Sequence, residues 1–265
     1  MPRTRGPVHR LVRRVPGVQA LYGELRLQLA LRRRIATLDH PGTDVRIRVP
    51  TRSIARLRVR PVEKEPWTVR WLEQELRPGD VLWDVGANVG SYALIAARLE
   101  PGARVVAVEP GYANYAALCE NVQLNGLGGR VLALPAALAE SSRLGELSLA
   151  EVEPGAAIHQ LDAERPGPNV QAVVVHALDE LVQRFGLPAP TLLKVDVDGA
   201  EPAVLAGAAA ALAREELRSV IVEIEEENGD PVVAALGTAG LGLHERIAER
   251  DGVPLPGVWY GVFRR

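Results

Sequence analysis

The sequence predicts an α/β domain built on a doubly wound, mainly parallel sheet of Rossmann-like type. Three observations lead to this prediction. Apolar runs typical of buried strands alternate with helical patterns from residue 81 to residue 239. The first of these strands, 81–85, leads into a glycine turn that opens a helix at 89–99. The chain has 265 residues and is 47% apolar, which is enough to bury a core of this size.

The same alternation, with its short connections, predicts the remaining elements in order. Residues 140–170 interrupt it with apolar residues among prolines and glycines, and we expect a hairpin insertion there that caps the substrate site. The expected core strands are 81–85, 104–109, 130–135, 192–197 and 219–225, followed by two closing strands at 243–248 and 258–263. The expected helices are 89–99, 112–125, 177–186, 201–214 and 230–239.

Residues 1–60 are predicted to form a basic extension ahead of the main domain, which spans 61–265. Apolar residues at a helical period predict a helix over 17–38. This helix is expected to pack on the main domain or to join copies of the chain in a homo-oligomer. The remaining elements of this region are a turn at 39–42, a hairpin with strands at 45–49 and 54–59, and a helix at 67–76.

The net charge is −2, but charge is unevenly distributed along the chain. Residues 1–60 carry 15 arginines and three acidic residues, whereas the rest of the chain carries 16 basic and 30 acidic residues. One interpretation is an arm that binds nucleic acid or anionic lipid. The other is a solvated basic surface beside an acidic domain. The second is favoured because Tyr22 is the only aromatic residue before Trp67, and nucleic-acid bases stack on aromatic side chains. We therefore expect no nucleic-acid partner.

Membrane-spanning proteins and proteins stabilised by disulfides do not fit the sequence. It contains no run of about 18 apolar residues, so we expect no membrane span. Cys119 is the only cysteine, which excludes intramolecular disulfides. The chain is therefore expected to be a cytoplasmic enzyme.

The glycine turn after the first core strand indicates a nucleoside-binding site. Asp84 lies near the end of that strand, Gly86 and Gly90 frame the turn around Asn88, and Glu109 ends the next strand. Dinucleotide sites use Gly-x-Gly-x-x-Gly, and the middle glycine, which admits a pyrophosphate, is missing here. S-adenosylmethionine has no phosphate but carries a sulfonium and an ammonium. Asp84 is expected near the ammonium, and Glu109 is expected to bind the ribose hydroxyls. These two carboxylates suit S-adenosylmethionine better than NAD.

A second cluster of polar residues lies where the 192–197 strand ends. Lys194, Asp196 and Asp198 alternate along it, so their side chains project to one side. Asp196 is the first candidate for a catalytic base, His176 the second, and Lys194 is a candidate catalytic residue beside them. Asp196, Asp198 and Glu223 are candidate ligands for a divalent cation. The alternative is that these carboxylates pair with Lys194, cap a helix or face solvent.

Several segments together resemble the FkbM family of methyltransferases, over roughly residues 45–228. The resemblance implies the seven-stranded class I methyltransferase sheet, whose last strand runs antiparallel. It also implies S-adenosylmethionine as cofactor, with Pro110 beside it, and a hydroxyl of a polyketide, sugar or related natural product as acceptor. The segments are Glu65-Pro66, Pro78-Gly79-Asp80, Asp84–Gly90, Val108-Glu109-Pro110, Asn121, Asn125-Gly126, Leu178–Leu181, Leu193–Glu201 and Val204–Gly207.

The sequence-based hypothesis is therefore an S-adenosylmethionine-dependent O-methyltransferase acting on a small-molecule hydroxyl. An NAD-dependent oxidoreductase and a polyanion-binding protein with a basic arm are the alternatives. The methyl acceptor is left open, because the first 45 residues and the chain after Asn228 carry no family signature.

Overall fold

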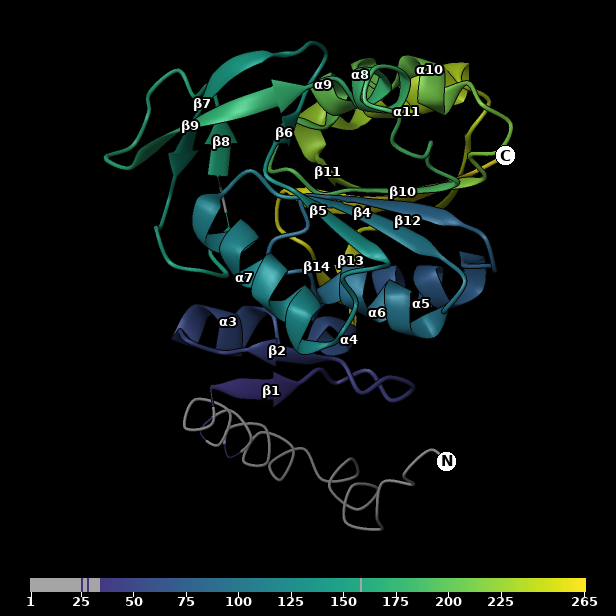
Figure 1. Ribbon diagram of the computed structural model, residues 1–265. Coiled ribbons are helices and arrows are strands. Elements are labelled where there is room, and N and C mark those ends of the chain that lie inside the picture. Colours follow the sequence, from purple (N-terminus) through teal and green to yellow (C-terminus); the bar gives the residue numbers. More distant parts are fainter. Residues whose placement is uncertain (1–24, 26–27, 29–33, 158) are drawn as a thin grey trace.

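The computed structural model describes residues 25, 28, 34–157 and 159–265. Its centre is a seven-stranded sheet in the order β12-β15-β11-β10-β3-β4-β5, which confirms the predicted fold class (Figure 1). The strands β3 to β5, β10 and β11 pair in parallel. These strands are β3 (Val81–Val85), β4 (Arg104–Val108), β5 (Val131–Leu134), β10 (Leu192–Val195), β11 (Ser219–Glu225), β12 (Gly242–Ile247) and β15 (Val258–Arg264).

Helices cover both faces of this sheet, as a parallel sheet requires (Figure 1). Each face has its own apolar core, and β3 is buried along its whole length between the two. One face is covered by α5 (Pro66–Glu75), α6 (Ser91–Leu99) and α7 (Tyr112–Leu124). The other face is covered by α8 (Leu178–Gln183), α9 (Glu201–Ala206), α10 (Ala209–Leu212) and α11 (Gly229–Thr238), which follows the short η1 (Glu226–Asn228).

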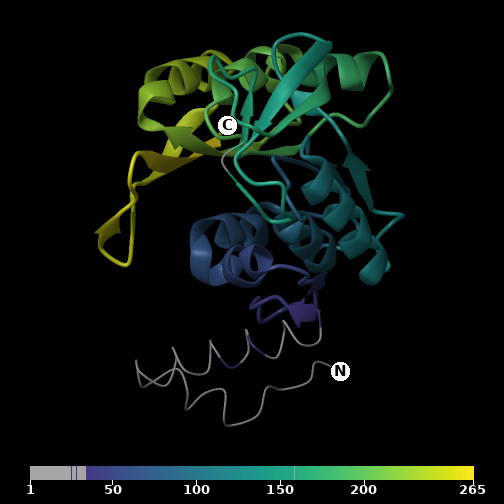
Figure 2. The same ribbon diagram turned by 90° about the vertical axis from the view of Figure 1, so that its left-hand side faces the viewer.

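The two closing strands were predicted correctly, and the last one inserts into the sheet. β15 lies between β11 and β12 and is antiparallel to both. The connection between β12 and β15 carries a small hairpin that projects from the body of the molecule (Figure 2). It consists of β13 (Glu249–Arg250) and β14 (Val253–Pro254).

The helix predicted over 201–214 is divided into α9 and α10 at Gly207. A Cβ at Gly207 would lie 2.0 Å from the Ala139 carbonyl oxygen, so the chain passes too close for a side chain. The new helix start is capped by Asp179, whose carboxylate accepts hydrogen bonds from the N–H groups of Ala210 and Ala211 at 2.7 and 2.8 Å. Contacts with distant residues therefore override a continuous helical pattern.

The insertion is a second sheet of four strands in the order β6-β9-β7-β8, more than the expected hairpin. Its two longest strands pair antiparallel over six residue pairs. The strands at its two ends pair with these, which extends the sheet to both sides. They are β6 (Ala137–Leu138), β7 (Arg143–Leu149), β8 (His159–Leu161) and β9 (Val170–His176).

The region before the main sheet corrects two predictions. The strand expected at 54–59 is a helix, α3 (Arg52–Leu57), because Thr51 caps it by accepting a hydrogen bond from the Ile54 N–H at 3.2 Å. The strand partner of β2 (Arg46–Arg48) is instead β1 (Ile35–Thr37), at the end of the segment predicted as helix. The short α4 (Pro61–Lys64) follows.

Most of the predicted 17–38 helix lies outside the described residues, and so does the homo-oligomer contact expected from it. The β2 strand is fixed on α7, because the N–H groups of Arg46 and Arg48 donate to the side chains of Asn125 and Asn121 at 2.9 and 2.8 Å. Among the described residues, the structure has no helix with the length and apolar character needed to cross a membrane.

Candidate active site

A cavity lies beyond the carboxyl ends of β3, β4, β10 and β11, where open α/β sheets bind ligands. The glycine turn, the Glu109 carboxylate, Asp196 and Glu223 line it. The turn of the insertion at Ala156 lines it as well. The cavity therefore collects most of the residues predicted to bind the cofactor and the acceptor.

The glycine turn has a backbone that only glycine adopts without strain at two positions. Gly86 has φ +80°, and a Cβ there would lie 1.7 Å from the carbonyl oxygen of Asp196. Gly90 has φ +88°, and a Cβ there would lie 2.5 Å from Leu118. The N–H of Gly86 donates to the Val108 carbonyl at 3.0 Å. The turn is thus pressed between β4 and β10, so that its backbone forms a wall of the cavity.

Asn88 connects this turn to two other segments. Its backbone is left-handed, with φ +51°, a conformation that asparagine tolerates. Its N–H donates to Glu109 Oε2 at 2.8 Å, and its Nδ2 donates to the Ala156 carbonyl at 2.7 Å. Asn88 therefore positions the Glu109 carboxylate and holds the insertion over the cavity.

Glu109 is held by N–H donors and keeps room for a ligand. The Gly111 N–H donates to Oε1 at 2.9 Å, and Asn114 Nδ2 approaches the same oxygen at 3.4 Å. Burial raises the pKa of Glu109 to about 7, although these hydrogen bonds and the one from Asn88 oppose the rise. A carboxylate has about four acceptor positions, and three donors already occupy Glu109, so it can accept one further hydrogen bond, from a ligand hydroxyl.

The insertion closes over the same end of the cavity. The Asn114 side chain accepts a hydrogen bond from the Gly155 N–H at 2.7 Å and donates to the Ala156 carbonyl at 3.2 Å. Asp198 Oδ2 accepts from the His159 N–H at 3.2 Å. The carbonyl of Pro110, itself in the cavity wall, accepts from Gln171 Nε2 at 2.7 Å. These contacts hold the insertion over this part of the cavity.

Asp84 does not line the cavity, although its carboxylate was expected near the ammonium of the cofactor. Its side chain is fully buried beneath the cavity, and Oδ1 lies 3.3 Å from Lys194 Nζ. Burial raises the pKa of Asp84, against the attraction of that ammonium. Asp84 and Lys194 are direct neighbours in the β3–β10 register. The sequence alone did not indicate this pairing, because the two residues lie on different strands.

Lys194 joins Asp84 to the cavity. Its Nζ also lies 3.0 Å from Asp196 Oδ2, and it is only 3% exposed. Burial acts to lower the pKa of Lys194, but Asp196 and Asp84 raise it above its usual value. Burial likewise opposes ionisation of Asp196, but Lys194 holds the pKa of that carboxyl below its usual range. Asp196 is therefore an anion in the cavity wall.

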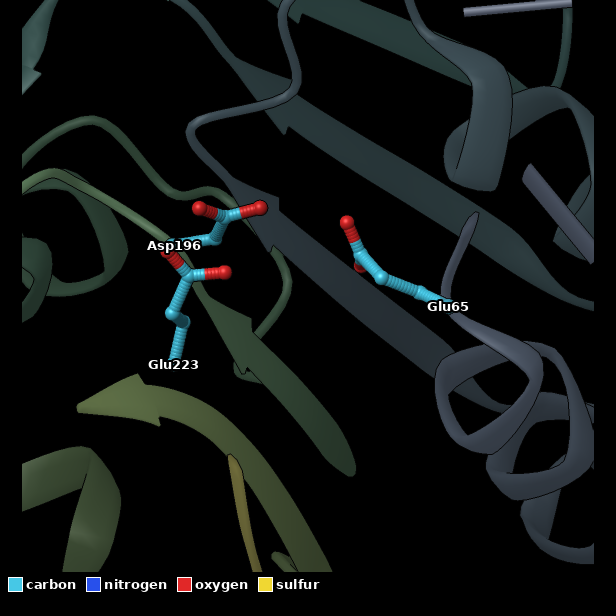
Figure 3. Close-up of side chains that lie close together, drawn as sticks. All are labelled: Glu65, Asp196 and Glu223. Atoms are coloured by element: carbon cyan, nitrogen blue, oxygen red, sulfur yellow. The ribbon is translucent and has the colours of Figure 1, made fainter. Parts of the chain in front are cut away.

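Three carboxylates gather at this end of the cavity and form what we call the carboxylate cluster. Oxygens of Glu65, Asp196 and Glu223 lie within 4.8 Å of one another (Figure 3). Two ammonium groups offset their charge: Lys64 Nζ is 2.5 Å from Glu65, and Lys194 contacts Asp196. Of the three predicted cation ligands, Asp196 and Glu223 are brought together. Asp198 is not in the cluster, because its side chain holds the insertion.

Glu223 differs from Asp196 in its partner. The hydroxyl of Tyr260 donates to Glu223 Oε2, so a neutral donor meets this carboxylate instead of an ammonium. Burial, and then the negative charge of Asp196, raise the pKa of Glu223 to about 8. Neighbouring carboxylates in the cluster therefore have pKa values shifted in opposite directions.

His176, the second candidate for a base, lies outside the cavity lining. Its Nδ1 is 3.1 Å from the Ser142 hydroxyl and 3.9 Å from Glu180, and its ring packs edge-on against Phe185. The reason is that β9 belongs to the second sheet, so its end is directed toward α8 instead of the main site. The structure thus gives His176 a surface environment at the insertion.

The match to known sequences decides the family. Residues 84–241, more than half of the chain, match the family model described as the methyltransferase FkbM domain. The chain belongs to the FkbM methyltransferase family. This membership decides against the NAD-dependent oxidoreductase and agrees with the missing middle glycine of the turn.

Two curated relatives of this FkbM-family chain are named for their substrates. The hexuronic acid methyltransferase AglP of Haloferax volcanii is 36% identical over 169 residues, 63% of this chain and 65% of that protein. The 31-O-demethyl-FK506 methyltransferase FkbM of Streptomyces tacrolimicus is 32% identical over 205 residues, 67% of this chain and 77% of that protein. The chain thus spans just under two thirds of the length of AglP.

One of the similar solved structures also carries the family name. The methyltransferase FkbM from Methylobacillus flagellatus KT has 14% sequence identity and a TM-score of 0.48, over 77% of this chain and 62% of that chain.

Three residues of this FkbM-family site were missed by the sequence analysis. Glu65 belongs to the Glu65-Pro66 family segment, but nothing nearby in the sequence indicated that it meets Asp196. Lys64 precedes it, and Arg58 lay in the segment interpreted as a strand. All three come from the region before residue 84, and Lys64 and Arg58 line the cavity. Their place in the site follows only from the fold.

Proposed function

We propose that this protein transfers a methyl group from S-adenosylmethionine to a hydroxyl of a small molecule, such as a sugar or another natural product. The observation that carries this proposal is the position of Glu109. Its carboxylate lines the cavity at the end of β4, next to a glycine turn, and has one acceptor position left for a ribose hydroxyl. The carboxylate cluster lies across the same cavity, where an acceptor would meet the cofactor.

The cofactor's place follows from the charges and the space at each end. A ribose hydroxyl would donate to Glu109, and the methionine part would lie along the backbone of Gly86 to Gly90. Asp84 would act indirectly, because it is buried under Lys194 and supports the ammonium that holds Asp196. The cofactor supplies an activated methyl group, and the chain supplies its orientation.

In the proposed reaction the acceptor oxygen attacks the methyl carbon in line with the sulfur. The carbon–oxygen bond forms as the carbon–sulfur bond breaks, and the hydroxyl proton passes to Asp196 and then to solvent. Alignment of the two reactants is the main catalytic contribution in such a transfer. Asp196, held as an anion by Lys194, would orient the hydroxyl and receive its proton.

The names of the relatives support a small, oxygen-rich acceptor. One is named for a hexuronic acid and the other for a 31-O-demethyl precursor. The carboxylate cluster could accept hydrogen bonds from the hydroxyls of such molecules. The single cysteine supports a reducing, cytoplasmic setting for the proposed enzyme.

The proposed reaction needs no divalent cation. The carboxylate cluster already meets two ammonium groups, Lys64 Nζ at 2.5 Å and Lys194 Nζ at 3.0 Å. A cation would have to displace them or lie beside them. Activity should therefore persist in the presence of a chelator.

The test is an assay for turnover with a panel of hydroxylated small molecules, including uronic acids and neutral sugars. The protein is incubated with S-adenosylmethionine, and S-adenosylhomocysteine is measured together with the mass gain of the acceptor. Methylation of an oxygen, identified by NMR, is the expected result. Methylation at nitrogen or carbon, or demethylated cofactor without a methylated product, would contradict the proposal.

A further inference from the structure

Arg58 is a cation of the cavity wall that no carboxylate of the described chain pairs with. Lys64 also lines the cavity, but its ammonium pairs with Glu65 at 2.5 Å. Arg58 Nε donates to the Gly155 carbonyl at 3.2 Å. Within the described ranges its two terminal amino groups have no hydrogen-bond partner. The planar end of the guanidinium is therefore available to a ligand.

Arg58 is rigidly placed by contacts on both sides. It forms the C-terminal cap of α3, where its N–H donates to the Ile54 carbonyl at 2.9 Å. The turn of the insertion packs on the same helix so closely that a Cβ at Gly155 would lie 2.5 Å from the Ile54 side chain. Thr51 adds a hydrogen bond to the Pro154 carbonyl at 3.1 Å. A preorganised arginine loses less entropy when it binds a ligand.

Arg58 lies next to the glycine turn, along which the methionine part of the cofactor is proposed to lie. Its carbonyl accepts a hydrogen bond from the Ser91 hydroxyl at 3.1 Å, and Ser91 is the first residue of α6, directly after the glycine turn. Its positive charge is close enough to lower the pKa of both Glu109 and Asp196. Arg58 thus lines the same cavity as the proposed ribose contact and the proposed acceptor contact, with its charge near both.

S-adenosylmethionine carries one carboxylate, on its methionine part, and a guanidinium binds a carboxylate through two parallel hydrogen bonds. We propose that Arg58 binds the α-carboxylate of the cofactor's methionine part. The region before the matched family domain then completes the cofactor site. This inference rests on the proposed function, because it presupposes that S-adenosylmethionine is the ligand.

The test compares two ligands that differ in the carboxylate. S-adenosylhomocysteine has the amino-acid part, and 5′-methylthioadenosine lacks it. Their affinities are measured by calorimetry for the wild-type protein, Arg58→Gln and Arg58→Lys. Arg56→Gln is the matched control, because Arg56 is exposed on the same helix and is not part of the cavity wall.

Arg58→Gln should weaken S-adenosylhomocysteine binding by about tenfold to a hundredfold, as expected for hydrogen bonds to a charged group. Its affinity for 5′-methylthioadenosine should stay at the wild-type value. Arg58→Lys should recover part of the loss, because it keeps the charge without the fork. Arg56→Gln should change neither affinity.

Two results would overturn the inference. An equal loss for both ligands would show that Arg58 only holds the Gly155 turn in place. An unchanged affinity for S-adenosylhomocysteine would show that its carboxylate binds elsewhere. If the wild-type protein binds neither ligand, the proposed function fails as well, so the two failures are distinguishable.

Discussion

The two ends of the cavity satisfy their carboxylates in different ways. At one end Glu109 is held by neutral N–H donors from Asn88 and Gly111. At the other end the carboxylate cluster meets the ammonium groups of Lys64 and Lys194. The first arrangement fixes one acceptor group for a single kind of ligand. The second arrangement balances several charges in a small space. The loss of one of them leaves a buried charge without its counter-charge.

This difference predicts which substitutions should have the largest effects. Neutral hydrogen bonds contribute modestly to stability, whereas a buried charge without its partner is expensive. Substitutions at the carboxylate cluster should therefore have larger effects than substitutions around Glu109.

The largest effect is expected from Lys194→Met. It leaves Asp84, which is fully buried, without the ammonium at 3.3 Å. Removing one partner of a buried ion pair costs about 3–5 kcal/mol of unfolding free energy. Urea unfolding followed by tryptophan fluorescence measures it. The double variant Lys194→Met with Asp84→Asn should recover much of this loss, and a single variant as stable as the wild type would show that the pair is not a counter-charge.

Asp196→Asn should lower the rate of methyl transfer about a hundredfold or more, the usual contribution of a positioned proton acceptor. Binding of S-adenosylhomocysteine should change little, because its proposed contact is Glu109 and not Asp196. The rate is measured with the acceptor found in the panel. Glu227→Gln is the control, since Glu227 is exposed beyond β11. A variant that keeps most of the wild-type rate would remove Asp196 from its proposed role.

Asn114→Ala tests the Glu109 end, where we expect a smaller effect. It removes the hydrogen bonds to Gly155 and Ala156 and one donor to Glu109. S-adenosylhomocysteine affinity should fall by about tenfold, which corresponds to about one or two lost hydrogen bonds. Calorimetry compares it with Gln123→Ala, an exposed residue on α7. Equal affinities in both variants would mean that the insertion does not support the cofactor end.

Glu109 should also make the stability of the protein depend on pH. Burial raises its pKa from the ordinary value of 4.5 to about 7. The folded state therefore binds the proton more tightly, and the resulting stability is fully present below 4.5 and is lost as pH rises through 7. The stability of the wild type relative to Glu109→Gln should shrink between about pH 5 and about pH 8. A difference that is constant across this range would contradict the shifted pKa.

The sequence predicted the Glu109 end much better than the carboxylate cluster. The turn around Asn88 and the Glu109 carboxylate lie at the ends of two adjacent strands, so local patterns place them together. Glu65, Asp196 and Glu223 come from three distant segments, and only the finished sheet brings their oxygens within 4.8 Å. Glu65 was therefore missed as a site residue, although it belonged to a recognised family segment.

The errors in the fold have a similar physical origin. Alternating apolar residues at 54–59 fit a strand, but the cap from Thr51 and the contact with Gly155 favour a helix. The 201–214 helix divides at Gly207 because a distant carbonyl leaves no space for a side chain. Asp84 ended beneath the cavity because its partner, Lys194, lies on the adjacent strand. In each case a contact between distant residues decided the local structure.

The most direct test of the account is a crystal structure of the wild-type protein with S-adenosylhomocysteine. We expect a ribose hydroxyl to donate to the Glu109 carboxylate and the sulfur to face the carboxylate cluster. A ligand whose ribose lies away from Glu109, or whose sulfur is directed away from Asp196, would contradict the central claim that this cavity aligns the methyl donor with its acceptor.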